Sequence, residues 1–192
     1  MENMLRTLFS VAPIDEKLDA LARNRILTCT YKAGTLLVIA GDTCPNMYFV
    51  KSGFLRSFML DTAGREKTIF LAPEETLISD GESLYIELHS QVNIQAVEDS
   101  EVYCIPKSLT HLANDQLLKQ SDYNTMLRSS VCHLEKRMIQ LFNTSSEEKY
   151  REFLLQYPNL ERRMTAKMLA SYLNISLRSL QAAKEKYQAK RN

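Results

Sequence analysis

The pattern of hydrophobic and polar positions divides the chain into a β-rich body and two helical regions. Between about residues 26 and 105, short hydrophobic runs alternate with turn residues such as Gly34, Gly41 and Gly53. Eight such runs, spaced at roughly 8–12 residues, are typical of a closed or sandwiched antiparallel sheet. The runs are ILTCTY, TLLVIA, MYFVK, FLRSFML, KTIFLA, TLIS, VNIQAV and SEVYCI. We therefore expect an α+β protein with an antiparallel, jelly-roll-like β-roll.

Helical spacing appears on both sides of this body. Residues 1–25 carry apolar positions at helical intervals, interrupted at Pro13, and residues 107–143 contain no Gly or Pro. In the second region, five apolar positions step by 4, 3, 4 and 3, which is typical of a two-stranded coiled-coil seam. These are Leu127, Val131, Leu134, Met138 and Leu141. The pattern predicts a dimerisation helix, although a helix packed on its own roll would look similar. The same register continues upstream to polar Asn124 and Gln120.

The most specific motif lies near the end of the chain, in residues 166–184. Two short helices that cross steeply need a small residue at their contact, and Ala170 is in that place. Their turn needs a residue that tolerates positive φ, which Asn174 does, and Ser176 can cap the second helix. A shared apolar core comes from Leu169, Leu173, Ile175, Leu180 and Ala183. The pattern predicts a helix-turn-helix, whereas two packed helices with no DNA role are the alternative.

A helix-turn-helix places the first half of its second helix in the DNA major groove. Arg can bond guanine and Gln can bond adenine there, while other polar groups contact phosphate and set the register. The predicted DNA-binding residues are Arg163, Thr165, Lys167, Ser176, Arg178, Ser179, Gln181 and Lys184. Each of them could instead be a solvated surface side chain.

The charge distribution agrees with a polyanion partner at this end. Residues 1–146 hold 14 Lys+Arg and 18 Asp+Glu, whereas residues 147–192 hold 10 and 5, so the two parts carry −4 and +5. The four cysteines and three histidines are widely separated, which is unlike a metal or iron–sulfur site. We expect reduced thiols, no metal, no cofactor and no enzyme activity. The lack of a long apolar run or signal peptide favours a cytoplasmic protein.

The order of a roll, a long helix and a helix-turn-helix resembles the Crp/Fnr family of bacterial transcription regulators. The stretches that carry the resemblance are YKAGTLLVIAGD, MYFVKSGFLRSFML, NIQAVEDSEVYCIPK and EEKYREFLLQYPNLERRMTAKMLASYLNISLRSL. The resemblance implies a homodimer, an effector pocket in the roll, a winged helix-turn-helix, and DNA and RNA polymerase as candidate partners. Because the chain stops at Asn192, we expect any late wing strand to be short or absent. The implied divisions are a sensor domain at 1–106, a dimerisation helix at 107–143 and a DNA-binding domain at 144–192.

The sequence departs from this family in the effector site. Its cyclic-nucleotide binders hold ribose and phosphate with a Gly-Glu turn followed by an Arg-Ser/Thr pair. Gly81-Glu82 matches the turn, but Ser90-Gln91 stands where the pair is expected, and residues 68–106 contain eight acids and no Lys or Arg. A buried phosphate needs a charge partner or several donors, so we expect that cyclic AMP is not the ligand. The predicted pocket residues are Gly81, Glu82, Ser83, Ser90, Gln91 and Asn124.

A second departure lies in the reading helix. Family members often have Glu where Arg178 stands and Arg where Ala182 stands, so the usual operator cannot be transferred. The sequence predicts a homodimeric DNA-binding regulator with an unidentified effector. The alternatives are a degenerate dimeric module that senses ligands or binds proteins, and a cupin-like enzyme, for which no metal-binding cluster is visible.

Overall fold

The computed structural model describes residues 16–109, 120–142 and 145–190. Its body is a roll of two four-stranded antiparallel sheets, with the orders β1-β8-β3-β6 and β2-β7-β4-β5. The strands are β1 Leu27–Tyr31, β2 Leu36–Val38, β3 Asn46–Ser52, β4 Leu55–Leu60, β5 Glu66–Ala72, β6 Leu77–Ile78, β7 Asn93–Ala96 and β8 Ser100–Pro106. All eight predicted strands are therefore confirmed, together with the β-roll.

The two sheets enclose a hydrophobic core, to which alternate residues of each strand contribute because strand side chains point to opposite faces. The buried members of this core are Val38, Cys44, Tyr48, Val50, Leu55, Ala72, Ile78, Ile94, Ala96, Val102 and Cys104. The turn between β3 and β4 requires glycine. Gly53 has φ +93°, and a Cβ there would lie 2.3 Å from Ser100 Oγ.

One short helix, α3 Gly81–Ile86, follows β6 and was not predicted. It has only six residues, which is too short for a helical period to be visible in the sequence. Asp80 caps its first turn and Glu87 ends it in the left-handed conformation, with φ 62°.

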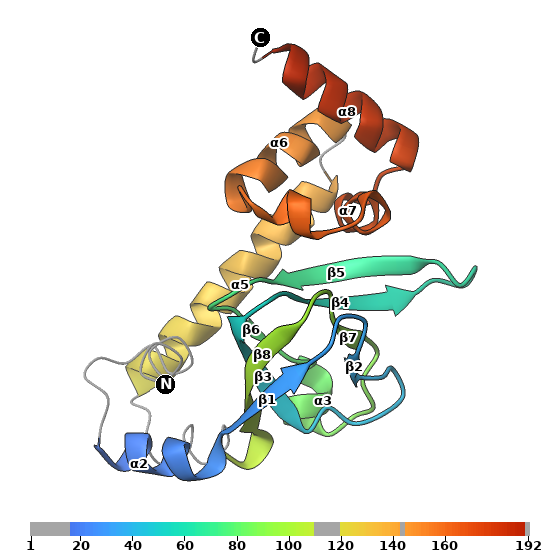
Figure 1. The fold of residues 1–192 in the computed structure, drawn as a ribbon. Helices are drawn as coiled ribbons and strands as arrows, with labels where there is room; N and C mark the ends of the chain where they lie inside the picture. Colours follow the sequence, from blue (N-terminus) through green and yellow to red (C-terminus); the bar gives the residue numbers. More distant parts are fainter. Residues whose placement is uncertain (1–15, 110–119, 143–144, 191–192) are drawn as a thin grey trace.

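The remaining helices lie before and after the roll. Helix α2 Glu16–Arg25 precedes β1, and the first part of the helical region predicted for 1–25 lies outside the described residues. Helix α5 Gln120–Phe142 runs along the roll and reaches the C-terminal helices, as Figure 1 shows. Those helices are α6 Ser146–Gln156, the 3-10 helix η1 Leu160–Arg163, α7 Ala166–Leu173 and α8 Leu177–Ala189.

The turn between α7 and α8 has the geometry that the sequence predicted. Asn174 ends α7 in the left-handed conformation, with φ 52° and ψ 51°. The Ser176 hydroxyl caps α8 by accepting a hydrogen bond from the Ser179 amide. Ser145 caps α6 in the same way. Residues 145–190 contain helices and no strand, so this part of the chain lacks the wing that the resemblance implied.

The C-terminal helices share a core with the roll. Phe54 and Leu71 of the roll are buried in one cluster with residues of α6, η1, α7 and α8. Helix α7 packs on β5, which is the edge strand of its sheet. In Figure 1, β5 lies directly below the C-terminal helices. The Ser171 hydroxyl donates to the Glu66 carbonyl and accepts from the Thr68 amide, both at 2.8 Å. A helix side chain thus satisfies backbone groups of an edge strand that would otherwise be open.

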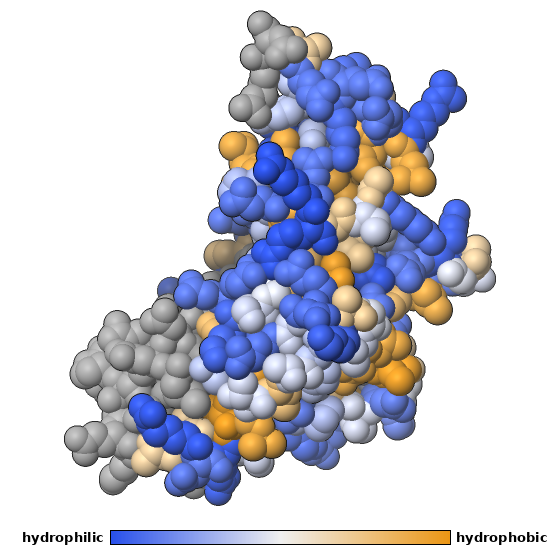
Figure 2. All heavy atoms as spheres, in the orientation of Figure 1, coloured by the Kyte–Doolittle hydropathy of each residue, from blue (hydrophilic) through white to orange (hydrophobic). Residues whose placement is uncertain are grey.

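The surface gives no sign of a membrane-spanning segment. Within the described ranges, no helix combines the length and the hydropathy that crossing a bilayer would require. The face in Figure 2 is mostly hydrophilic over the C-terminal helices, with small hydrophobic patches between hydrophilic side chains.

Candidate functional site

The first half of α8 presents polar side chains to solvent. Arg178 and Gln181 are exposed, and the Gln181 amide donates to Glu185 Oε1 at 2.8 Å. Within the described residues, no hydrogen bond or ion pair engages the Arg178 guanidinium, so its donors face water. Leu177 is also exposed, at the start of the helix. The opposite side of α8 packs inward through Leu180 and Ala183.

Four other predicted DNA-binding residues lie at helix N-termini. Ser176 and Ser179 face each other in the first turn of α8, with their hydroxyl oxygens 2.8 Å apart. Thr165 caps α7 and accepts from the Met168 amide at 3.2 Å. The following Lys167 is exposed in the first turn of α7. The N-termini of α7 and α8 and the Lys167 side chain are thus close in sequence to the exposed face of α8. Helix N-termini and lysine both favour the binding of anions.

Arg163, which was predicted to lie near DNA phosphates, is engaged within the chain. Its guanidinium donates to Glu74 Oε2 at 2.9 Å and Oε1 at 2.7 Å, and to Glu98 at 2.5 and 3.3 Å. The two carboxylates raise the pKa of Arg163, and the guanidinium lowers the pKa of Glu74. Both acids belong to the roll, so Arg163 joins the roll to the C-terminal helices.

Lys184 is also engaged within the chain. Its ammonium lies 2.6 Å from Glu161 Oε1, and the other oxygen of this carboxylate accepts from the Tyr150 hydroxyl at 2.8 Å. Lys184 therefore links α8 to η1 and α6, and its contact with DNA stays a prediction. Sequence reasoning did not select Arg162, which is exposed next to Arg163.

The predicted effector residues surround a carboxylate that the sequence analysis had not selected, that of Asp80. Its Oδ1 accepts from the amides of Glu82 at 3.0 Å and Ser83 at 3.2 Å. Its Oδ2 accepts from the Ser90 hydroxyl at 2.7 Å and the Gln91 amide at 3.1 Å. Asp80 and Ser90 are both buried. The backbone and hydroxyl donors that could hold a phosphate here are therefore bonded to an acid of the chain itself.

The other predicted effector residues are placed as follows. Ser83 is buried and accepts from the Cys44 amide at 2.6 Å, whereas Gly81, Glu82 and Gln91 are exposed. The side chain of Asn124 lies outside the described part of the chain. The structure thus brings Ser83, Ser90 and Gln91 together around Asp80.

A buried arginine of the roll, Arg56, does not supply the missing cation. Its Nε and Nη2 donate to Gln95 Oε1 at 3.0 and 2.7 Å, and Nη2 also lies 2.8 Å from Glu66 Oε2. The guanidinium rests over the Phe58 ring, 4.2 Å from its centroid. Its donors are thus used between β4, β5 and β7, not at α3.

The seam predicted on α5 exposes large apolar side chains. Val131, Leu134 and Met138 are 61, 64 and 56% exposed, and Leu141 is half-buried, whereas the side chain of Leu127 lies outside the described residues. Ile139 and Phe142, which the heptad pattern did not include, are exposed as well, at 63 and 77%. A row of this kind on one helix marks a surface that another chain can cover.

The four cysteines differ in burial. Cys44 and Cys104 are buried, Cys29 is half-buried and Cys132 is exposed, all as free thiols. Burial raises the pKa of Cys44, and it raises the pKa of Cys104 to about 12. Among the residues described, no group of three or more His, Cys, Asp or Glu could hold a metal ion.

Comparisons with known proteins agree with this architecture. Residues 28–112 match the cyclic nucleotide-binding domain family, and no curated protein matches the sequence. A Crp/Fnr-family transcriptional regulator from Eubacterium rectale superposes with a TM-score of 0.71 at 19% identity, covering 92% of this chain and 85% of that one. The Thermus thermophilus catabolite activator protein gives 0.55 at 21% identity, covering 96 and 87%. The c-di-GMP-responsive regulator CLP of Xanthomonas campestris gives 0.64 at 17% identity, covering 92 and 93%.

The resemblance that the sequence indicated is thereby confirmed for the fold. Residues 28–112 match the model of the cyclic nucleotide-binding domain family, and the chain as a whole has the fold of Crp/Fnr-family transcriptional regulators.

Proposed function

We propose that the chain is a homodimeric, sequence-specific DNA-binding transcription regulator that does not respond to cyclic AMP. The observation that carries the proposal is the first half of α8, where Arg178 and Gln181 are exposed on a helix capped by Ser176. In a helix-turn-helix this half enters the major groove, where guanidinium and amide groups discriminate bases. The division into a sensor domain at 1–106, a dimerisation helix at 107–143 and a DNA-binding domain at 144–192 belongs to this proposal.

Dimerisation through α5 fits this role. The exposed Val131, Leu134 and Met138 repeat at coiled-coil spacing, and burial of such a row stabilises association by about 25 cal/mol per Å² of apolar surface. A two-fold dimer presents two reading helices, so its operator would be a symmetric pair of half-sites about one helical turn apart.

The loss of cyclic AMP binding follows from Asp80. A cyclic phosphate at α3 would lie against this buried carboxylate and would repel it, while the donors it needs are already satisfied. No Lys or Arg occurs in residues 68–106 to offset that cost. A thermal-shift titration with cyclic AMP tests this point, because a ligand that binds only the folded state raises the melting temperature. We expect no rise at millimolar nucleotide, and a saturable rise would contradict this part of the proposal.

The main test is fluorescence-anisotropy binding of the pure protein to DNA from upstream of its own gene. Scrambled DNA of the same composition is the control, and both are measured at two salt concentrations. Preferential binding without added ligand supports an operator-binding regulator. Equal and salt-sensitive binding to both duplexes would mean that the upstream region holds no operator or that an effector is required.

The altered reading helix favours one alternative function. Ala182 and Arg178 replace the residues that family members often carry, so the chain could act as a dimeric ligand-sensing or protein-interaction module. Such a module would dimerise and would bind neither duplex, even at low salt, which distinguishes it from the proposed regulator.

A further inference from the structure

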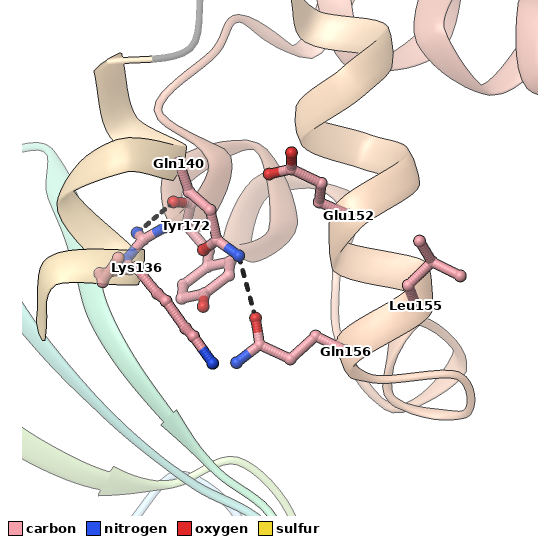
Figure 3. Close-up of a pocket in the computed structure, with 7 residues that line it drawn as sticks. Lys136, Gln140, Glu152, Leu155, Gln156 and Tyr172 are labelled. Carbon is pink, nitrogen blue, oxygen red and sulfur yellow. Dashed lines mark hydrogen bonds between the residues drawn. The ribbon is translucent and has the colours of Figure 1, made fainter. Parts of the chain in front are cut away.

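A cleft of about 430 Å³ lies between the second half of α5 and the helices α6 and α7. This volume is within the range of small-molecule sites, roughly 300–1,000 Å³. Figure 3 shows the side chains of these helices around it. The residues that line it are Lys136, Arg137, Gln140, Glu152, Leu155, Gln156 and Tyr172. None of them belongs to the effector site at α3 or to the exposed face of α8.

Arg137 is the unusual member of this set. Its Nη2 donates to the Tyr172 carbonyl at 2.5 Å, and its guanidinium stacks over the Tyr172 ring, 3.9 Å from the centroid. Its Nε is buried without a hydrogen-bond partner. Burial lowers the pKa of this guanidinium, and no carboxylate of the described residues forms an ion pair with it. A partly buried cation without a counter-charge is costly, so an anion beside it would be stabilising.

The rest of the cleft adds a second cation and a polar rim. The Lys136 side chain extends across the cleft toward Gln156, as Figure 3 shows, and it is exposed to solvent. The amides of Gln140 and Gln156 bond to each other at 3.1 Å. Glu152 is the one acid among these lining residues, whereas Lys136 and Arg137 are both cations. The lining of the cleft therefore carries a net positive charge.

Apolar surface in the cleft comes from Leu155, which is 76% exposed, whereas the Tyr172 ring is buried beneath the Arg137 guanidinium. A bare inorganic anion would leave most of the volume unfilled. A flat apolar group attached to the anion would bury this surface at about 25 cal/mol per Å².

Dimerisation through the seam does not provide the missing counter-charge. In the register set by Val131, Leu134 and Met138, Arg137 occupies position g, and the e position of the next turn is Phe142. Positions e and g face each other across a parallel coiled coil, so the guanidinium would meet an apolar ring and not a carboxylate.

We propose that this cleft binds a small aromatic carboxylate. The carboxylate pairs with the Lys136 ammonium and the guanidinium of Arg137, and the ring covers the apolar lining near Leu155. Since the cleft joins the dimerisation helix to α7, such a ligand would bridge the two elements. The proposal does not depend on DNA reading, and it can hold even if the proposed regulator function fails.

The experiment is a ¹⁹F NMR titration of the full chain with 4-fluorobenzoate, compared with the uncharged 4-fluorobenzamide. We expect saturable binding of the carboxylate at millimolar or lower concentration, and binding of the amide at least tenfold weaker. Lys136→Ala and Arg137→Met should each weaken carboxylate binding about tenfold, a change of about 1.4 kcal/mol. Arg128→Met is the matched control, because Arg128 is exposed on the same helix outside the cleft, and it should bind as the wild type does.

Three results would overturn the proposal. They are equal binding of the carboxylate and the amide, unchanged carboxylate binding in Lys136→Ala, and no binding of either probe up to about 20 mM, which corresponds to about −2.3 kcal/mol. Circular dichroism of each variant establishes that it is folded. The exposed Lys136 provides a test even if Arg137→Met does not fold.

Discussion

Asp80 is a buried acid before helix α3. Its carboxylate accepts four hydrogen bonds from the first turn of α3 and from the Ser90 region. A bound phosphate would need the same kinds of donor. Asp80 has the advantage over a free phosphate that it is part of the chain, so it loses no entropy of association when it accepts these hydrogen bonds. These hydrogen bonds support the proposal that the site at α3 does not hold a cyclic phosphate.

We expect Asp80→Ala to reduce the free energy of unfolding by about 1–3 kcal/mol, because buried amides and the Ser90 hydroxyl lose their acceptor. Urea unfolding followed by circular dichroism measures this change. Glu82→Ala is the control, since Glu82 is exposed on the same helix and should cost under about 0.5 kcal/mol. Equal effects of the two substitutions would show that Asp80 does not organise this site.

At the scale of residues, the sequence predicted what local backbone chemistry determines. The left-handed Asn174 and the cap at Ser176 could both be foreseen, because φ and capping preferences are properties of a residue and its neighbours. Arg163 could not be placed, because its partners Glu74 and Glu98 are distant in sequence and only the fold brings them near. The same reason applies to Arg137, whose partner Tyr172 is distant in sequence, whereas Asp80 was missed because the helix that it caps was not predicted.

Helix α8 is the element on which the proposed DNA reading depends. We expect Arg178→Ala to cost about 1–3 kcal/mol of specific binding and to relax the preference at one base pair, because the exposed guanidinium can contact guanine. Lys167→Ala is the comparison, since a phosphate contact should weaken all sequences alike and reduce the salt slope by about 1. Anisotropy titrations over a set of single-base operator variants separate the two effects. Unchanged affinity and unchanged base preference in Arg178→Ala would reject this assignment.

Helix α5 carries the prediction about assembly. We expect Leu134→Glu to weaken the dimer by about a hundredfold or more, because it removes two apolar side chains from the seam and introduces two charges there. Sedimentation equilibrium measures the dissociation constant. Leu155→Glu serves as the control, since Leu155 is similarly exposed but lies on α6, away from the seam. A Leu134→Glu protein that remains a dimer as tight as the control would contradict the seam.

The strands were predictable as elements because each hydrophobic run is bounded by turn residues. The six-residue helix α3 was not predictable, because its apolar positions are too few to establish a period. The pairing of the two sheets also required the structure, because strand order depends on contacts between distant segments, such as β1 with β8.

At the scale of the whole molecule, the roll and the C-terminal helices form one packed body. Phe54 and Leu71 lie in the core of the C-terminal helices, Ser171 bonds the edge of β5, and Arg163 reaches Glu74 and Glu98. A displacement of β5 would therefore alter the packing and hydrogen bonds of α7. The hydrophobic pattern did not predict this junction. Such a pattern indicates which residues are buried, but not which residues they pack against.

We expect Arg163→Met to weaken the junction by about 1 kcal/mol, the upper range for partly exposed ion pairs. Hydrogen exchange of the Thr68 amide, which donates to Ser171, should then be about fivefold faster, while the Ile94 amide within the roll is unchanged. Arg162→Met is the control, because Arg162 is exposed beside Arg163.

The effect of Arg163→Met on the junction should depend on pH. The Arg163 guanidinium lowers the pKa of Glu74, so this carboxylate stabilises the junction above its unfolded pKa and loses that contribution as the pH falls through its folded value. The difference between wild type and Arg163→Met should therefore be full at neutral pH and shrink once the pH is below 4.5, the ordinary carboxyl value. A difference that persists in acid would show that the ion pair is not its cause.

We propose above all that this chain reads DNA sequence as a symmetric dimer without a cyclic nucleotide. Selection of bound duplexes from a random-sequence pool, with no ligand added, tests this proposal most directly because no operator has to be known. We expect an enriched two-fold symmetric motif whose half-sites are about one helical turn apart. Recovery of no enriched motif at low salt, from protein shown to be folded and dimeric, would contradict it.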